Sequence, residues 1–326
     1  MSLLRAAAAA PIAESIAESS SAARPIETRF RPDWQVDPAA TLRQIWQGPG
    51  DPHVRLSGNV FEQAARTPLG PACLRLEWLG GEVRAQAWGA GAEWILDRVP
   101  ELLGRDDDPA ALSPRHDIVR RLARAHAGTR LVRTGRVMDS LVPAVLSQKV
   151  TGYESRRSQR ELAVRLGEPA PGPLGATQGL RLPLAARQLA TQPDWVYHRA
   201  GIERRRADIL RRAAVVADRL EEIAGLPAED GRGRLLAIRG IGPWTVAETL
   251  RPVLGDPDLV SIGDYHLPNL VSWLLAGEPR GDDAKMLELL EPYRGQRARL
   301  VMLLELSGQS PPRYGPRLAP RSIRAI

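Results

Sequence analysis

Apolar and polar positions alternate with a period of two in the first part of the chain. The runs ACLRLEWLG (72–80) and GEVRAQAWG (81–89) both follow this alternation and meet at two glycines, which is typical of a β-hairpin with one buried face. Two runs with helical spacing flank them, DPAATLRQIWQ (37–47) and GAEWILDRVPELLG (91–104). We therefore expect residues 26–112 to form a small antiparallel-sheet domain with helices.

Beyond Pro114 the apolar positions recur three and four residues apart, as they do on one face of an α-helix. Four runs of this kind end at glycine: HDIVRRLARAHAG (116–128), MDSLVPAVLSQKVTGYESRRSQRELAVRLG (138–167), RRRADILRRAAVVADRLEEIAG (204–225) and GRGRLLAIRG (231–240). The acidic, proline-containing segment GRDDDPAALSPRHD (104–117) separates the two patterns, as a linker does. The expected fold class is α+β, with a mainly α-helical domain over residues 113–308.

The two ends of the chain differ from both patterns. Residues 1–25 are rich in Ala and Ser but too weakly apolar for a secretory signal, and residues 309–326 form a Pro/Arg-rich tail. No apolar run is long enough to span a bilayer. Cys73 is the single cysteine, which excludes a disulfide framework, a four-cysteine iron–sulfur cluster and a cysteine-based zinc site. We expect a disordered leader and a cytoplasmic protein without membrane contact, metal or cofactor.

Basic residues concentrate in the middle of the chain. Residues 113–222 contain 21 Lys and Arg against 11 Asp and Glu, while the whole chain has a net charge of +7. Such a surface suits a polyanion, although arginines that merely solvate helices explain the count equally well. Only Lys149 and Lys285 are lysines, a restriction that matters because amine catalysis needs a lysine or a free amino terminus.

The stretch LLAIRGIGPWTVAETL (235–250) places Gly240 and Gly242 between two helical runs, with Pro243 directly after them. Glycine closes one helix and proline suits the first turn of the next, so the stretch predicts a tight helical hairpin. Backbone N–H groups at the start of the second helix would then be open to a phosphate. An isolated G-x-G is more often an ordinary turn between helices.

Together with the loop GDPDLVSIGDYHL (255–267), the hairpin resembles the helix-hairpin-helix superfamily of DNA glycosylases. LVPAVLSQKVTG (141–152) is similar to the family's glutamine-bearing helix, and PYRGQRARLVMLL (292–304) to its closing helix. The segment before the helical domain resembles the amino-terminal domain of DNA-3-methyladenine glycosylase II. The resemblance covers residues 28–308 and implies that Gly240, Ile241, Gly242 and Thr245 contact DNA.

The resemblance also implies a catalytic residue. Asp264, 24 residues after Gly240, occupies the place of the family's catalytic aspartate. A carboxylate there would stabilise the positive charge that develops on the deoxyribose as the glycosidic bond breaks. Taken alone, an aspartate before an apolar run is an ordinary helix N-cap.

Trp244 separates two types of enzyme. Superfamily members that also cut the strand have a lysine at this position, whereas 3-methyladenine glycosylase II has tryptophan, and an indole cannot form a Schiff base. Glu248 lies one turn further along the same helix face, where the resemblance leads us to expect an aromatic residue. Met302 and Leu303 likewise stand where aromatics are expected, so the base pocket is less aromatic than in the family.

Three further residues complete the expected site. Gln148 and Tyr265 are assigned to the base pocket with Trp244 and Glu248. Lys149 follows the helical glutamine at the position that inserts into the DNA stack, where apolar or amide side chains are suited. A solvated surface lysine remains an alternative for Lys149.

The sequence thus predicts a monomeric, monofunctional DNA N-glycosylase, associated with the nucleoid and active in base excision repair. It would flip alkylated purines of the 3-methyladenine and 7-methylguanine type out of damaged double-stranded DNA and hydrolyse their glycosidic bonds. Two alternatives stay open: a non-catalytic DNA-binding protein, and a bifunctional glycosylase/lyase that uses Lys149.

Overall fold

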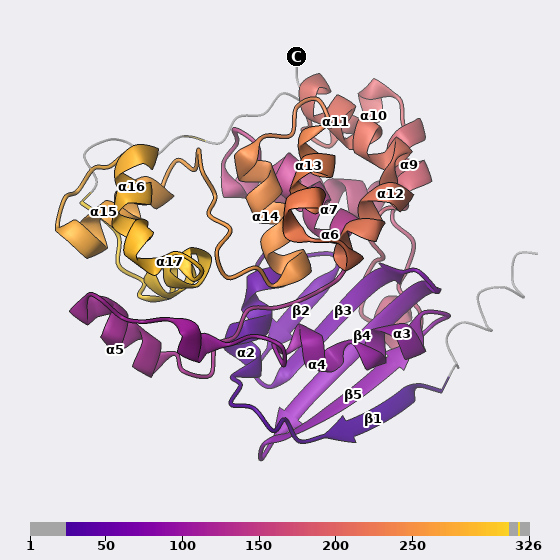
Figure 1. Cartoon of the computed structure of the whole chain (residues 1–326). Coiled ribbons are helices and arrows are strands. Elements are labelled where there is room, and N and C mark those ends of the chain that lie inside the picture. Colours follow the sequence, from indigo (N-terminus) through magenta and orange to yellow (C-terminus); the bar gives the residue numbers. More distant parts are fainter. Residues whose placement is uncertain (1–23, 313–318, 320–326) are drawn as a thin grey trace, which may run out of the picture.

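The computed structural model describes residues 24–312 and residue 319. A five-stranded antiparallel sheet has one group of helices above it and a second group beside it in the view of Figure 1, in agreement with the expected α+β class. The strands run in the order β1-β5-β4-β3-β2 across the sheet, with bounds Ile26–Phe30 (β1), Val54–Ser57 (β2), Val60–Thr67 (β3), Gly70–Leu79 (β4) and Glu82–Trp88 (β5).

The predicted hairpin is strands β4 and β5, joined at Gly80 and Gly81. Leu79 pairs with Glu82, and the two glycines have φ of 59° and 80°. Two successive positive φ angles suit the right-handed twist of the strands. The helices that flank the hairpin are shorter than their sequence runs: Pro38–Leu42 (α2), Ala92–Asp97 (α3) and Val99–Leu102 (α4).

The sheet packs against other parts of the chain on both faces, one of them covered only in part. One face packs Phe61, Leu74 and Leu76 against Ile95 and Leu103. The opposite face packs side chains of β3, β4 and β5 against the Pro/Gly-rich segment that contains helix Pro173–Ala176 (α8); the residues of this small core are Ala64, Cys73, Trp88, Ala170, Leu174, Leu180 and Leu182. This segment therefore attaches the helical region to the sheet.

Burial in this small core raises the pKa of Cys73 to about 12, and the nearby Glu62 carboxylate adds to the increase. A thiol that stays protonated is a poor nucleophile. Cys73 is therefore a packing residue.

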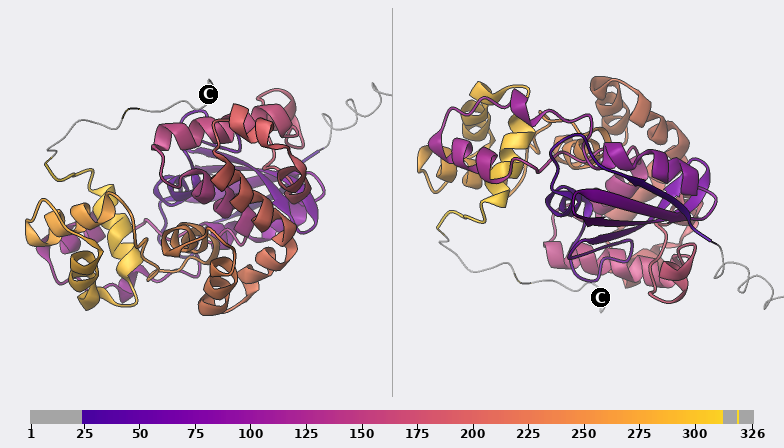
Figure 2. Two further views of the ribbon diagram at one scale, coloured as in Figure 1. Left: turned by 90° about the horizontal axis from the view of Figure 1, so that it is seen from above. Right: turned by 90° about the horizontal axis from the view of Figure 1, so that it is seen from below.

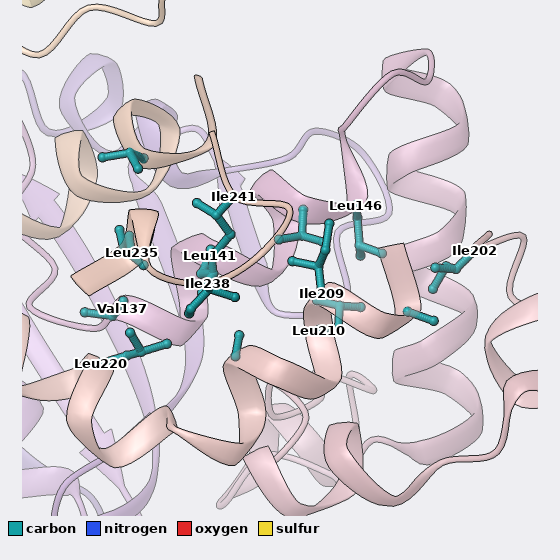
Figure 3. Packing of buried hydrophobic residues seen from close by; sticks show 14 of the residues in the cluster. Val137, Leu141, Leu146, Ile202, Ile209, Leu210, Leu220, Leu235, Ile238 and Ile241 are labelled. Atoms are coloured by element: carbon teal, nitrogen blue, oxygen red, sulfur yellow. The ribbon is translucent and has the colours of Figure 1, made fainter. Parts of the chain in front are cut away.

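The first group of helices surrounds a core that includes Leu141, Leu146, Ile209, Leu235 and Ile241 (Figure 3). Its members are Val137–Leu146 (α6), Gly152–Leu166 (α7), Ala186–Thr191 (α9), Asp194–Arg199 (α10), Arg204–Val215 (α11), Ala217–Glu221 (α12), Ala228–Leu236 (α13) and Pro243–Leu254 (α14). The long run 138–167 is divided into α6 and α7, because Thr151 and Glu154 form a capping box that starts a new helix.

The second group has a hydrophobic core of its own, which includes Val119, Val271, Met286, Leu290 and Val301. It consists of Asp117–Ala125 (α5), Leu267–Ala276 (α15), Asp283–Leu290 (α16) and Arg297–Leu306 (α17). Figures 1 and 2 show this group as a lobe beside the sheet, with α5 against helices from the far end of the chain. The stretch expected as one helical domain thus contains two cores, connected by the loop between α14 and α15.

A buried ion pair fixes the lobe to the linker. Arg299 on α17 is 2% exposed and donates to Asp107, which also accepts a hydrogen bond from the Leu131 backbone N–H at 3.0 Å. The predicted leader (1–25) and tail (309–326) lie largely outside the described residues. None of the helices within the described part of the chain is long and apolar enough to cross a membrane.

Candidate active site

Glycine has a different structural role at each of the two hairpin positions. Gly240 has φ of +103°, and a Cβ there would come within 2.6 Å of Ile209 Cγ1, so the fold itself requires glycine. Gly242 has φ of −115°, and a Cβ there would meet nothing within 4 Å. No side chain caps the start of α14 at this point. The missing side chain at Gly242 therefore leaves the helix N-terminus accessible rather than relieving a clash.

Gln148, expected in the base pocket, instead joins the end of α6 to the hairpin. Its amide Nε2 donates to the Gly240 carbonyl at 3.2 Å and to Thr245 Oγ1 at 2.9 Å. Thr245, expected at the DNA, is 2% exposed, and Ile241 is buried in the first helical core. These three residues hold the hairpin in place.

Lys149 is exposed on the turn after α6 and has φ of 54°, the one positive φ among the non-glycine residues that the structure describes. A left-handed conformation costs a non-glycine residue roughly 1–2 kcal/mol. Gln148 beside it is anchored on the hairpin. The anchored glutamine places the backbone of Lys149 on an exposed turn beside the hairpin.

Asp264 is a helix cap and a partner of Trp244 at the same time. Its Oδ1 accepts hydrogen bonds from the backbone N–H groups of His266 at 2.8 Å and Leu267 at 2.9 Å, at the start of α15. Its Oδ2 accepts one from Trp244 Nε1 at 2.9 Å. The carboxylate is thus held in one orientation between α14 of the first helical group and α15 of the second.

A cavity of about 320 Å³ extends from Trp244 between the helices and the sheet. This volume lies in the usual range for small-molecule pockets, about 300–1,000 Å³. One face of α14 contributes Trp244, Glu248 and Arg251, and α17 contributes Met302 and Glu305. The opposite wall comes from the sheet domain, where Gln47, Asp51, His53 and Gln63 line the cavity.

Glu248 lines this cavity but is already hydrogen-bonded. Its Oε1 accepts from the Ser261 hydroxyl and, at 3.3 Å, from Arg251 Nη2. The first bond ties the loop that carries Asp264 to α14. Glu248 therefore helps to position the loop that carries Asp264 as well as to shape the cavity wall.

Glu305 lies near one cationic and two anionic side chains. Burial within the surrounding protein raises the pKa of its carboxyl group. The Arg251 guanidinium opposes the increase, and the carboxylates of Glu248 and Asp264 add to it. The residue is nevertheless exposed to solvent, and water that hydrates the carboxylate weakens the effect of burial.

No family model matches the chain. A Mycobacterium tuberculosis protein described as a probable bifunctional transcriptional activator/DNA repair enzyme AlkA is 31% identical over 175 residues, which is 52% of this chain and 34% of that protein. The chain thus spans about a third of the length of the curated relatives it matches. The 3-methyladenine DNA glycosylase of Archaeoglobus fulgidus superposes with a TM-score of 0.72 at 16% identity, over 86% of this chain and 97% of that one.

The chain has the fold of a DNA glycosylase. The 8-oxoguanine glycosylase/lyase of Clostridium acetobutylicum, solved with double-stranded DNA, shares it with a TM-score of 0.65 at 13% identity, over 86% of this chain and 95% of that one. The resemblance to the superfamily is therefore confirmed for the fold. Since one of these two structures is named a glycosylase and the other a glycosylase/lyase, the fold does not decide between those activities.

Within this glycosylase fold, only some of the expected site residues line the cavity. Trp244, Glu248 and Met302 line the cavity, and Asp264 is bonded to Trp244. Tyr265 is 79% exposed with its ring edge-on to His266, and Leu303 is buried in the second helical core. Neither residue lines the cavity.

Sequence reasoning missed Arg251 and Glu305. Helical spacing held a signal for both, because Arg251 lies seven residues after Trp244, and Glu305 lies three after Met302, in each case on the same helix face. The cavity residues of the sheet domain gave no such signal, since only tertiary packing brings them to this wall.

The two glycines lead to opposite expectations for stability. Gly240→Ala should lower the free energy of unfolding by about 1–2 kcal/mol or more, because alanine is strained at positive φ and meets Ile209. Gly242→Ala should change it by no more than about 1 kcal/mol, since alanine accepts this extended backbone. Urea denaturation of both variants tests the difference. A larger loss at Gly242 would contradict the roles given to the two residues.

Proposed function

We propose that this protein is a monofunctional DNA N-glycosylase that excises alkylated purines of the 3-methyladenine and 7-methylguanine type from double-stranded DNA. The observation that carries the proposal is the Asp264 carboxylate, which is fixed by the start of α15 and by Trp244, a residue that lines the cavity. A flipped base would occupy the cavity, and its deoxyribose would lie beside Asp264.

The geometry suits hydrolysis through a sugar cation. As the bond from C1′ to a cationic purine breaks, its electron pair neutralises the departing base, and positive charge builds on the deoxyribose. A carboxylate that is already oriented stabilises that charge without reorganising. A water oxygen then bonds to C1′, and its proton passes to Asp264 and on to solvent. No second acid is needed when the base is already cationic in the DNA, because it then departs as a neutral molecule.

The placement of both lysines supports a monofunctional reaction. The chain has two lysines, and neither lines the cavity. Lys285 on α16 lies 3.7 Å from carboxylate oxygens of both Glu278 and Glu288. Lys149 lies on the exposed turn after α6. A lyase reaction needs an amine that can reach C1′, and the hairpin position that would supply it carries Trp244.

Exposed cations beside the hairpin support DNA docking. Arg212 Nη1 donates to the Arg239 carbonyl at 2.9 Å, and both residues are exposed next to Gly240. Arg206 is an exception, because it is 4% exposed and donates to the Leu146 carbonyl at 2.8 Å. The hairpin amides and these guanidinium groups would bind phosphates, which positions DNA without reading its sequence.

Gly242→Asp should weaken binding to abasic duplex DNA by roughly tenfold or more, because a carboxylate would face the phosphate, and like charges at an interface cost several kcal/mol. Fluorescence anisotropy at several salt concentrations measures the effect, with Gly242→Ala as the matched control that adds a side chain without charge. Equal affinity of the two folded variants would contradict phosphate binding at the hairpin.

Asp264→Asn should slow single-turnover release of 7-methylguanine by roughly a hundred- to thousandfold, or about 3–4 kcal/mol, because the charge that stabilises the sugar cation is removed. Asn can still accept the hydrogen bonds at the start of α15, so the fold should survive. Circular dichroism and affinity for abasic DNA check this.

The Asn side chain also presents an N–H group to the Trp244 N–H. Trp244→Phe serves as the control for this altered contact, since it removes the indole donor and leaves the Asp264 charge. Its loss of rate should be much smaller than that of Asp264→Asn. Excision by a folded, DNA-binding Asp264→Asn protein within a few-fold of wild type would reduce Asp264 to a helix cap.

The reaction should leave the abasic strand intact until it is heated in alkali. Borohydride should trap no covalent protein–DNA adduct beyond slow reaction of an amino terminus, because no lysine lines the cavity. Denaturing gels of both products provide the measurement. Efficient trapping that disappears in Lys149→Ala would show a bifunctional enzyme.

A further inference from the structure

Helix α7 has a basic side that the proposed reaction does not use. Tyr153, Arg156 and Arg160 are exposed and follow one another at intervals of three and four residues. Residues at this spacing share one side of a helix, and we call these three residues the α7 face. Tyr153 is 56% exposed. The α7 face thus presents an aromatic ring and two guanidinium groups to solvent.

The acidic residues of α7 lie on another side of the helix. Glu154 and Glu161 each directly follow a residue of the α7 face, which turns them about 100° around the helix. Glu154 accepts the Thr151 backbone N–H at 2.8 Å in the capping box, and Glu161 Oε2 lies 3.4 Å from Arg165 Nε. The arginines of the α7 face form no ion pair with a carboxylate among the described residues. The face therefore keeps its positive charge, and the half-buried Arg157 adds to it.

Arg160 is held against a loop of the sheet domain. Its Nε donates to the Gly50 carbonyl at 3.0 Å, and its Nη2 donates to the Pro49 carbonyl at 3.3 Å. A Cβ at Gly50 would lie 1.8 Å from Arg160 Nη2, so the missing side chain makes room for this contact. The Asp51 carboxylate of the same loop accepts hydrogen bonds from three backbone N–H groups. The carbonyls thus orient the guanidinium of Arg160 without neutralising it.

Two contacts fix the start of α7 relative to the hairpin. Ser147 Oγ at the end of α6 is hydrogen-bonded to Ser155 Oγ in the first turn of α7, at 2.7 Å. Gln148, the next residue, donates to the Gly240 carbonyl. The exposed Lys149 turn then leads into α7. The α7 face therefore keeps a constant position relative to the hairpin.

We propose that the α7 face is a second DNA-binding surface, which binds backbone phosphates of the duplex outside the hairpin. This inference rests on the proposed function and deepens it, because it names a further part of the protein that contacts DNA. Arg156 and Arg160 are about 6 Å apart along the helix axis. This is close to the separation of neighbouring phosphates on one DNA strand, so each guanidinium can bind one phosphate.

The composition of the α7 face favours DNA over an acidic protein segment. A DNA strand carries one negative charge at every nucleotide in a regular repeat, which matches cations that are one helix turn apart. An exposed aromatic ring beside guanidinium groups is also typical of nucleic-acid surfaces, because the ring packs against sugars or bases while the cations bind phosphates. Since α7 is fixed to the hairpin, one duplex contacts both surfaces.

The salt dependence of DNA binding tests the proposal. Binding of the full chain to an abasic duplex is measured by fluorescence anisotropy over a range of salt concentrations. Each phosphate contact contributes about 0.9 to the slope of log K against log salt concentration, through release of counterions. Arg156→Gln and Arg160→Gln should each lower the slope by about this amount. The double variant should also bind roughly tenfold more weakly at physiological salt.

Two further variants serve as controls. Arg165→Gln removes the same charge from another side of α7, where Arg165 is paired with Glu161, and its slope and affinity should stay close to those of wild type. Arg160→Lys keeps the charge but loses the fork that binds Pro49 and Gly50, so it should keep most of the slope. Circular dichroism checks that every variant is folded.

Shortened duplexes test whether the lost contact lies away from the lesion. Two duplexes contain the same abasic site, and each lacks the base pairs beyond it on one side. The double variant should bind more weakly than wild type to the full duplex and to one shortened duplex. It should match wild type on the other, because the missing arm is the one that lies along α7. Equal losses on both shortened duplexes would overturn the proposal.

The remaining outcomes separate this inference from the proposed function. A double variant that matches Arg165→Gln in slope and affinity would overturn the second surface, while weaker binding by Gly242→Asp in the same assay would leave the proposed function standing. Poly-glutamate that binds wild type but not the double variant, with unchanged DNA slopes, would assign the α7 face to an acidic protein instead. A wild-type chain that does not bind abasic duplex DNA would contradict both proposals.

Discussion

The hydrogen bond from Trp244 Nε1 to Asp264 Oδ2 is the contact on which the candidate site depends. It joins two helical groups that have separate hydrophobic cores. The loop 255–266 connects the same two groups along the chain, and the bond adds a second link between them. Because the opposite carboxylate oxygen caps α15, Asp264 has little freedom to turn. A functional side chain supported by two rigid helices keeps its orientation better than one on a free loop.

The same loop is held a second time by the hydrogen bond from Ser261 to Glu248. Glu248 stands where an aromatic residue was expected, and its polar contact with Ser261 anchors the loop that carries Asp264. Arg251 then balances the negative charge of Glu248 at 3.3 Å. The cavity wall combines the guanidinium groups of Arg136 and Arg251 with several carboxyl groups, among them those of Glu248 and Glu305.

The two glycines of the hairpin differ in whether the fold requires them. Gly240 is required by its own backbone angle and by Ile209, while nothing in the fold prevents a side chain at Gly242. Gln148 adds a link from α6 to this turn. The uncapped N-terminus of α14 at Gly242 is thereby held at a fixed position relative to the cavity. Trp244, two residues after Gly242, lines that cavity.

Local sequence determined the elements of this protein and the order of its motifs. The hairpin at Gly80 and Gly81, the turn before Pro243 and the cap at Asp264 all depend on backbone preferences that a few neighbouring residues set. Tertiary structure alone decided that α5 joins α15–α17 in a second core, that Gln148 contacts the hairpin and that Glu305 shares a cavity with Trp244. Periodicity shows which face of a helix is apolar, but it does not identify the partner of that face, because many distant segments offer similar apolar surface.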